Sequence, residues 1–412
     1  MSFVVEKDRV LAEIEELAAI SDAEAPAVTR IVFTPTDLKA RAWLTARCEE
    51  AGLAVRQDPI GNIFARWIGA EPDAAAVGTG SHIDAIPNAG KYDGVVGVLG
   101  GLEAIRALRR GEFRPKRSID LVVFTSEEPT RFGVGCLGSR LLSGSMSPDS
   151  ARKLMDKEGA SLEEVRVKAG LKGRLEEVKL PGGFYKAFVE LHIEQGPLLE
   201  RQQVSLGIVD RIAAPASLRI SVEGAGGHAG GVLMPERRDA LCAAAELILA
   251  VENEARSSGA ADTVATVGIC EVFPGAVNSI PSLVRISVDI RDTNLERRDA
   301  VVRVVENASH AIAAKRQVSI HQELLNADAP AECAPAIIEA LSESCKKHQL
   351  GFMQMVSRAY HDSLFMSRIA PVAMLFIPCR NGYSHRPDEY ASPEDIERGI
   401  VVLAETLASL AA

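Results

Sequence analysis

Histidines and carboxylates follow several apolar, strand-like stretches of the sequence. The residues concerned are His82 in GSHIDAIP, Asp93 in GKYDGVVG, His192 in ELHIEQGP, His385 in NGYSHRPDEY, and the adjacent acids Glu127 and Glu128 at the end of LVVFTSEE. Taken singly, each fits a structural role as well: a core histidine, or Asp93 as the N-cap of a helix. Taken together they can hold divalent metal ions, because imidazole and carboxylate groups are common ligands. Two metals about 3.5–4 Å apart need a carboxylate between them, and Asp93 can bridge.

The pair Glu127–Glu128 raises a separate question, since two like charges end a buried, β-branched run. Bound cations would offset the repulsion that otherwise raises the pKa of one glutamate. Neighbouring side chains of an extended segment point in opposite directions. One glutamate can therefore bind metal while the other faces the substrate as a general base. A solvated strand end before a turn is the structural alternative.

The elements around these residues predict a parallel α/β sheet. Strands are expected at AAAVGTG and SIDLVVFTS, and GVVGVLGGLEAIRALRR predicts a helix whose glycines allow close packing. Nearer the N-terminus, we expect a helix capped by Thr36 and ended by Gly52. Strands that alternate with helices form parallel sheets. Ligand sites in such sheets lie beyond the carboxyl ends of the strands, where the candidate ligands fall.

The pattern changes from about Arg211. Strands at SLRISVEG, DTVATVGICEV, SLVRISVDIRD and QVSIHQELL alternate with helices at 237–255 and 295–315. Their order is β-α-β-β-α-β, the ferredoxin-like order. A chain of 412 residues is also too long for one ordinary core. The sequence therefore predicts a catalytic domain of residues 1–210 and 327–412, with residues 211–326 as an inserted second domain.

Composition limits the class of protein and its partners. With 47% hydrophobic and 25% charged residues, the chain is typical of a globular protein. The net charge of −10 argues against nucleic acid or an anionic membrane surface as the main partner. Seven scattered cysteines without a CxxC pair favour reduced thiols and a cytoplasmic location. The N-terminal MSFVVEKDRV lacks the apolar region of a signal peptide.

The motifs together resemble the di-metal amidohydrolases. This family includes N-carbamoyl-amino-acid hydrolases, allantoate amidohydrolase and ureidoglycolate amidohydrolase, and is related to di-zinc aminopeptidases and carboxypeptidases. The stretches that carry the resemblance are GSHIDAIPNAGKYDGVVGVLGGLEAI, FTSEEPTRFGVGCLGSRLLSG, ELHIEQGP, GGHAG, NSIP, DIRD and GYSHRPDEY. It implies an α/β catalytic domain with a mixed, mostly parallel sheet flanked by helices. It also implies an inserted ferredoxin-like α+β domain that serves as lid and dimerisation domain of a homodimer.

The resemblance also implies a role for each candidate residue. The metal ligands would be His82, Asp93, Glu128, His192 and His385, with Asp93 bridging. Glu127 would be the base, and Asp84 would orient the imidazole of His82. Substrate contacts would come from Gln195, His228, Asn278, Arg291, Tyr360 and His361. The cofactors would be two divalent ions, with Mn²⁺ favoured in this branch and Zn²⁺ or Co²⁺ left open.

The resemblance also implies that three residues of the second domain bind the substrate, each in a different way. Arg291 would clamp a substrate carboxylate, Asn278 would bind the same end, and His228 would stabilise the oxyanion from the partner subunit. Structural alternatives exist for each: a turn at GGH, Asn278 as a turn residue, and Arg291 in a surface ion pair. The role of the second domain as lid and dimer interface depends on the same resemblance.

Within the family, the sequence is most similar to the ureidoglycolate amidohydrolase branch. Tyr360 precedes His361, where carbamoylases typically have glycine, and a tyrosine there would narrow the pocket toward a small polar substrate. The implied reaction cleaves the ureido C–N bond of (S)-ureidoglycolate and yields glyoxylate, ammonia and CO₂, a step of allantoin and purine catabolism. The alternative is an N-carbamoyl-L-amino-acid hydrolase or an allantoate amidohydrolase.

Overall fold

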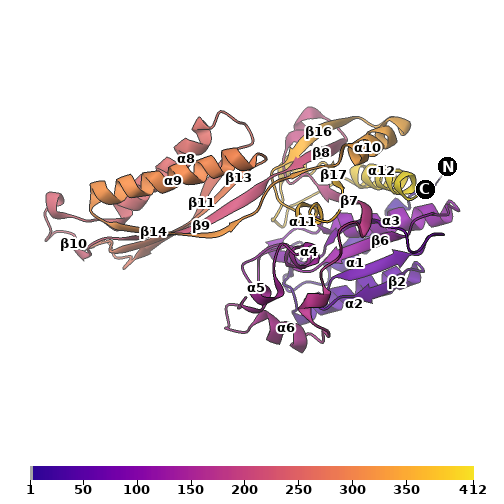
Figure 1. The fold of residues 1–412 in the computed structure, drawn as a ribbon, viewed down its shortest axis with the longest axis horizontal. Helices are drawn as coiled ribbons and strands as arrows, with labels where there is room; N and C mark the ends of the chain where they lie inside the picture. Colours follow the sequence, from indigo (N-terminus) through magenta and orange to yellow (C-terminus); the bar gives the residue numbers. More distant parts are fainter. Residues whose placement is uncertain (1–2) are drawn as a thin grey trace. The chain divides into compact units, whose positions relative to one another are not determined.

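The computed structural model describes residues 3–412 and divides the chain into two compact units (Figure 1). Unit 1 contains the chain up to Asp210, together with Glu332–Ser357 and His361–Ala412. Unit 2 contains Arg211–Ala331 and the short segment Arg358–Tyr360. Tyr360 and His361, adjacent in the sequence, therefore belong to different units.

The centre of unit 1 is a nine-stranded mixed sheet with the order β15-β8-β17-β7-β4-β6-β3-β2, in which β16 also pairs with β8. Its strands are β2 (Ala54–Gln57), β3 (Ile63–Trp67), β4 (Ala76–His82), β6 (Ile119–Phe124), β7 (Tyr185–Ile193), β8 (Leu206–Ile212), β15 (Ala331–Glu332), β16 (Phe352–Ser357) and β17 (Val372–Ile377). The four strands β17, β7, β4 and β6 are parallel, and β8, β3 and β2 add antiparallel pairs on either side. The mixed sheet expected from the sequence is confirmed.

Helices cover both faces of this sheet. The helices of unit 1 are α1 (Lys7–Ala18), α2 (Pro35–Glu50), α3 (Val95–Arg110), α4 (Leu137–Ser143), α5 (Pro148–Arg152), α6 (Leu162–Lys168), α7 (Leu198–Gln202), α10 (Pro335–Lys347), α11 (Asp362–Met366) and α12 (Pro393–Ala411). A parallel sheet buried on both sides needs apolar residues on both faces of its strands. Accordingly, every residue of β4, β6 and β17 is buried.

The glycines of α3 allow close approach to the sheet, as the sequence predicts. A Cβ atom on Gly97 would lie 2.3 Å from the carbonyl oxygen of Leu191 in β7, closer than any real contact. The N-cap of α2 is Thr34 and not Thr36, because Thr34 Oγ1 accepts the N–H of Asp37 and Pro35 occupies the first helical position.

The register of the parallel strands aligns their carboxyl ends. His82 is the last residue of β4 and pairs with Phe124, the last residue of β6. His192, near the end of β7, pairs with Phe376 near the end of β17. The loops that follow these strands therefore start at one edge of the sheet, which is where open α/β sheets carry their sites.

Unit 2 is a four-stranded antiparallel sheet with two helices. The strands are β9 (Ala214–Glu223), β11 (Val264–Phe273), β13 (Leu283–Asp292) and β14 (Ser319–Ala327), in the order β11-β13-β9-β14. Helices α8 (Ala240–Ser257) and α9 (Leu295–Arg316) share a core with alternate residues of these strands (Figure 1). The chain order β-α-β-β-α-β agrees with the ferredoxin-like pattern in the sequence.

Two short pairings complete the fold. In unit 1, β1 (Val28–Arg30) pairs antiparallel with β5 (Ala85–Ala89), and in unit 2, β10 (Gly227–His228) pairs with β12 (Ser279–Ile280). Single 3₁₀ turns occur at Leu175–Glu177, Met234–Glu236 and Arg380–Gly382. Within residues 3–412, no helix is long and apolar enough to cross a lipid bilayer. All seven cysteines are free thiols.

Candidate metal centre

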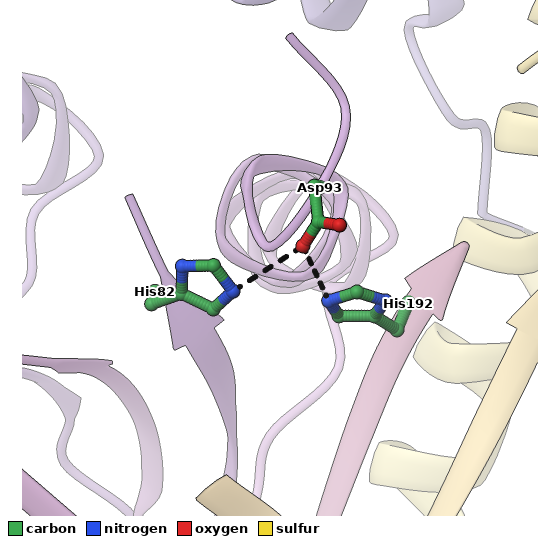
Figure 2. Close-up of side chains that lie close together, drawn as sticks. All are labelled: His82, Asp93 and His192. Carbon is green, nitrogen blue, oxygen red and sulfur yellow. Dashed lines mark ion pairs between the residues drawn. The ribbon is translucent and has the colours of Figure 1, made fainter. Parts of the chain in front are cut away.

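Asp93 is the meeting point of two imidazoles in unit 1. It lies in the loop just before α3, whereas His82 ends β4 and His192 lies near the end of β7 (Figure 2). Asp93 Oδ1 is 3.5 Å from His82 Nε2 and 3.3 Å from His192 Nε2. All three side chains are buried. The sheet thus brings together residues more than a hundred positions apart in the sequence.

A second group of possible ligands uses the other oxygen of Asp93. His385 Nε2 lies 3.5 Å from Asp93 Oδ2 and 3.1 Å from Glu128 Oε1. His385 comes from the loop between the turn at Arg380–Gly382 and α12, and it is exposed, unlike the other two histidines. Asp93 therefore belongs to two groups, each with room for one ion among its nitrogen and oxygen atoms.

Asp84 aligns the two adjacent glutamates. The backbone N–H groups of Glu127 and Glu128 donate to Asp84 Oδ1 and Oδ2, at 3.2 and 3.0 Å. The glutamate side chains then reach different histidines: Glu127 Oε2 lies 3.7 Å from His82 Nε2, and Glu128 reaches His385. The two side chains diverge as expected, although β6 ends at Phe124 and both glutamates lie in the loop that follows it.

The second nitrogen of each buried histidine fixes the direction of its ring. His82 Nδ1 faces the backbone carbonyl of Asp84 at 3.1 Å, and His192 Nδ1 faces the carbonyl of Ile193 at 2.9 Å. A nitrogen next to a carbonyl oxygen carries the proton, so the lone pair of the neutral ring is on Nε2, facing Asp93. The carboxylate of Asp84, expected to orient His82, is farther away at 3.7 Å. The Asp84 backbone carbonyl is the nearer partner.

Asp93 itself is held by groups that sequence reasoning missed or read differently. Glu389 accepts the backbone N–H groups of Tyr92 and Asp93, at 2.8 and 3.0 Å. The hydroxyl of Ser384 donates to Asp93 Oδ2. Gln195 Nε2 also donates to Asp93 Oδ2, at 2.6 Å, although we expected Gln195 to contact the substrate. The N-cap alternative for Asp93 is wrong, because Gly94 is the N-cap of α3.

Opposite charges shift the acid–base properties of the cluster. Burial would lower the pKa of His82, but the carboxylates of Glu127 and Asp93 outweigh it and raise that pKa well above its usual value. The hydrogen bond to Glu128 raises the pKa of His385 to about 9. Burial would raise the pKa of Asp93, but the two facing imidazoles hold it well below its usual range. Each shift favours the charged form of its group: a protonated imidazole beside an ionised carboxylate.

Glu127 differs from the other acids in this cluster. Burial raises the pKa of its carboxyl group well above the usual value, with a further contribution from Glu128 and opposition from His82. A carboxyl group that binds a proton readily is suited to take a proton and return it. Glu127 also lies beside the two groups of possible metal ligands, within reach of a water molecule or substrate bound there.

The donor set fits divalent metal. Three imidazole Nε2 atoms and the carboxylates of Asp93 and Glu128 converge where a cation would offset the repulsion between the acids. Mixed imidazole and carboxylate ligands suit Zn²⁺, Mn²⁺ and Co²⁺ alike, so the residues do not select one of them. The hydrogen bonds from the second nitrogen of each buried histidine and those to Asp84 provide the outer support that metal ligands need.

His192 also belongs to a third group of possible ligands, in which all residues are buried. Glu190, His192 and His361 have possible ligand atoms close together, and the rings of His192 and His361 are 4.5 Å apart in an edge-on arrangement. Glu190 accepts hydrogen bonds from Ser81 Oγ at 2.7 Å and from Ser363 Oγ at 2.6 Å. The signal for Glu190 was available in the sequence: a charged residue in a buried strand, two positions before His192 and so on the same face.

The other expected substrate contacts belong to unit 2. His228 in β10 is exposed, and the N–H of Ala229 donates to the carbonyl of Asn278 at 2.8 Å. Arg291 in β13 donates to Asp289 at 2.7 Å, which is the surface ion pair considered as its structural alternative. The guanidinium carbon of Arg291 also lies 5.5 Å from the centroid of the Tyr360 ring.

The chain matches a known protein family, characterised relatives and solved structures. The model of Peptidase family M20/M25/M40 matches residues 78–409. Ureidoglycolate hydrolases of Oryza sativa subsp. japonica and Arabidopsis thaliana are 50% and 51% identical, over 99% and 97% of this chain and 85% of each relative. The crystal structure of AtUAH in complex with glyoxylate has a TM-score of 0.92 and 50% identity, and covers 100% of this chain and 99% of that one. A second AtUAH structure, in complex with (S)-hydroxyglycine, also has a TM-score of 0.92, with 49% identity and the same coverage.

The family match covers most of the chain and includes every residue of the cluster around Asp93. The relatives add a hydrolytic activity on C–N bonds, and the clustered ligands agree with the metal dependence of the family. This chain belongs to peptidase family M20/M25/M40 and is a metal-dependent hydrolase.

Proposed function

We propose that this protein hydrolyses the ureido group of (S)-ureidoglycolate and yields glyoxylate, ammonia and CO₂. The observation that carries the proposal is the carboxylate of Asp93, shared by two groups of ligands beside Glu127. The substrate follows from the identity of about half of all residues with two ureidoglycolate hydrolases. Such a reaction would serve the catabolism of allantoin and other purine products.

In this proposal, His82, Asp93, Glu128, His192 and His385 hold two divalent ions, with Asp93 between them. Bound metal supplies Lewis acidity and lowers the pKa of a coordinated water toward neutrality. We propose Mn²⁺ as the ion used, with Zn²⁺ or Co²⁺ able to fill the same ligands. The free thiols of all seven cysteines fit a reducing, cytoplasmic location.

Glu127 is the proposed general base. It takes a proton from the attacking water and passes it to the departing nitrogen as the C–N bond breaks. The cleavage leaves carbamate, which loses CO₂, and hydroxyglycine, which eliminates ammonia. One water is consumed for each glyoxylate, two ammonia molecules and one CO₂. The raised pKa of Glu127 supports a group that holds the proton between the two transfers.

Substrate recognition is assigned to both units. Arg291 would bind the substrate carboxylate through its planar guanidinium, and Asn278 would donate to the same group. His228 would stabilise the oxyanion, a contribution worth several kcal/mol for a preorganised donor. Gln195, Tyr360 and His361 would line the remainder of the pocket. The hydrogen bond from Gln195 to Asp93 supports a second task for Gln195, that of fixing the proposed bridging carboxylate.

We further propose that residues 211–326 act as a lid and as the dimerisation domain of a homodimer. Among residues 3–412, no strand pairs with the outer edges of β11 and β14 in the unit 2 sheet, and these two strands expose Ile269 and Leu324. Free edges and exposed apolar residues favour pairing with another chain. Light scattering coupled to gel filtration tests this proposal, with a mass of twice 44.0 kDa expected. A monomer would contradict the dimer and the reach of His228 from a partner.

The alternative function is that of an N-carbamoyl-L-amino-acid hydrolase or an allantoate amidohydrolase. The experiment that decides is ammonia release from (S)-ureidoglycolate, allantoate and several N-carbamoyl amino acids by the manganese-loaded protein. We expect the highest kcat/KM with ureidoglycolate. A higher value for a carbamoyl amino acid or for allantoate would overturn the proposed substrate.

Tyr360→Gly sharpens the same test. Removing the phenol should lower the ratio of kcat/KM for ureidoglycolate over that for carbamoyl amino acids, since the pocket would widen and lose a hydroxyl. An unchanged ratio would remove Tyr360 from substrate selection.

A further inference from the structure

The thiol of Cys136 contacts the carboxylate that we propose as the general base. Cys136 Sγ donates to Glu127 Oε1 at 3.5 Å, while the other oxygen of Glu127 faces His82 at 3.7 Å. Both Cys136 and Glu127 are buried, so water does not compete for this hydrogen bond in the way it would at the surface. The two oxygens of the Glu127 carboxylate therefore face two different groups, the thiol and the imidazole.

Backbone hydrogen bonds fix the place from which the thiol approaches. The N–H groups of Cys136, Leu137 and Gly138 donate to the carbonyl groups of Glu127, Ser126 and Thr125, at 2.8, 2.9 and 2.8 Å. These three bonds join the start of α4 to the loop after β6, which carries the two glutamates. The backbones of Cys136 and Glu127 are thus held next to each other by hydrogen bonds.

The backbone of Cys136 adopts a conformation that is unfavourable for a residue with a side chain. Its φ and ψ are 55° and 35°, in the left-handed region that favours glycine. A residue with a Cβ atom is strained there. Glycine would relieve the strain and would also fill the N-cap position of α4. The hydrogen bond from its thiol to Glu127 is an interaction that glycine could not make and that offsets this strain.

The thiol keeps the proton that it must donate. Burial raises the pKa of Cys136 well above its usual value, and the charges of Glu127 and Asp362 raise it further. Cys136 is therefore a neutral donor rather than a nucleophile.

We infer that Cys136 is a positioning residue that orients the Glu127 carboxylate for proton transfer through its S–H···O hydrogen bond. The inference rests on the proposed function, in which Glu127 is the base. Cys136 itself does not touch the substrate in this account. Its loss should lower the rate of the chemical step and leave substrate binding as it is.

The test compares Cys136→Ala with Cys136→Ser in the metal-loaded protein. We expect Cys136→Ala to lower kcat about three- to tenfold with KM unchanged, the size of one lost hydrogen bond in the transition state. Cys136→Ser keeps a donor and should restore kcat to within about twofold. Cys48→Ala is the matched control, because Cys48 is equally buried but lies in α2, away from Glu127. Its kcat should equal that of the unmodified protein. A Cys136→Ala protein with unchanged kcat, or a serine variant no better than the alanine variant, would overturn the inference.

A double variant separates this inference from the proposed function. In a Glu127→Gln background, adding Cys136→Ala should lower the residual rate no further, since the group that the thiol orients is already gone. A further drop equal to that in the unmodified background would mean that Cys136 acts elsewhere, and would overturn the inference alone. Unchanged turnover in Glu127→Gln by itself would instead remove the base and the proposed function with it.

Discussion

The two units of this protein present their candidate residues in opposite ways. In unit 1, His82, Asp93 and His192 are at most 8% exposed, and each imidazole lies within 3.5 Å of the Asp93 carboxylate. In unit 2, His228 and Asn278 are exposed on a short strand pair and its turn. Electrostatic interactions between charged groups are stronger where water is excluded, and a buried site therefore suits metal binding and bond cleavage. Exposed hydrogen-bond donors carry no desolvation penalty in the free protein, and they are accessible to a charged substrate.

The largest effect should come from the buried unit. Glu127→Gln keeps the shape of the side chain but removes its basicity, so turnover should fall by about 10²–10⁴-fold. Metal content should stay unchanged, because Glu128 and not Glu127 is the proposed ligand. Steady-state ammonia release and metal analysis measure the two quantities. Loss of metal together with turnover would instead indicate that Glu127 is a metal ligand. The assignment of different roles to Glu127 and Glu128 would then be wrong.

A smaller effect of a different kind is expected from unit 2. Arg291→Ala should raise KM for a carboxylate substrate by about 10- to 100-fold, the value of one or two charge-assisted hydrogen bonds. Arg219→Ala is the control, since Arg219 is an exposed arginine of the same sheet with its own ion pair to Glu323. It should leave KM as it is. If Arg291→Ala changed kcat alone, the contrast between a catalytic unit and a recognition unit would not hold.

The smallest effect should appear as protons released on metal binding. In the metal-free protein the pKa of His385 is raised to about 9, so this histidine is protonated at pH 7. A metal ion needs the neutral ring, so binding at pH 7 should release its proton, and the release should vanish as pH rises above 9. Calorimetry in buffers of different ionisation enthalpy measures it. The His385→Ala protein should release about one proton fewer at pH 7. Equal release from both proteins would exclude His385 from the site.

Much of this architecture could be predicted because its signals are local. The buried strands β4 and β6 are short apolar runs, and the order of elements in unit 2 follows from alternating periodicities. The convergence of His82, Asp93 and Glu127 follows from one rule, that parallel strands end at one edge. Element bounds were less certain: α8 begins at Ala240, after the N-cap Asp239, and not at 237.

What could not be predicted depends on contacts between distant segments. Glu389 holds the backbone of Asp93 from 296 positions away, and no local pattern indicates this pairing. Asp84 was correctly placed near His82, but its carboxylate binds the amides of the two glutamates instead. The thiol of Cys136 contacts Glu127 from a residue in the left-handed conformation, which the sequence does not favour for cysteine.

The central claim is that one carboxylate serves two metal ions, and metal content tests it most directly. We predict about two equivalents of manganese per chain in the reconstituted protein. Asp93→Asn should lose most of both, whereas the control Asp149→Asn, a change in an exposed acid of α5, should keep both. Plasma mass spectrometry after removal of free metal provides the count. Two ions retained by Asp93→Asn, or a single ion in the unmodified protein, would contradict the account.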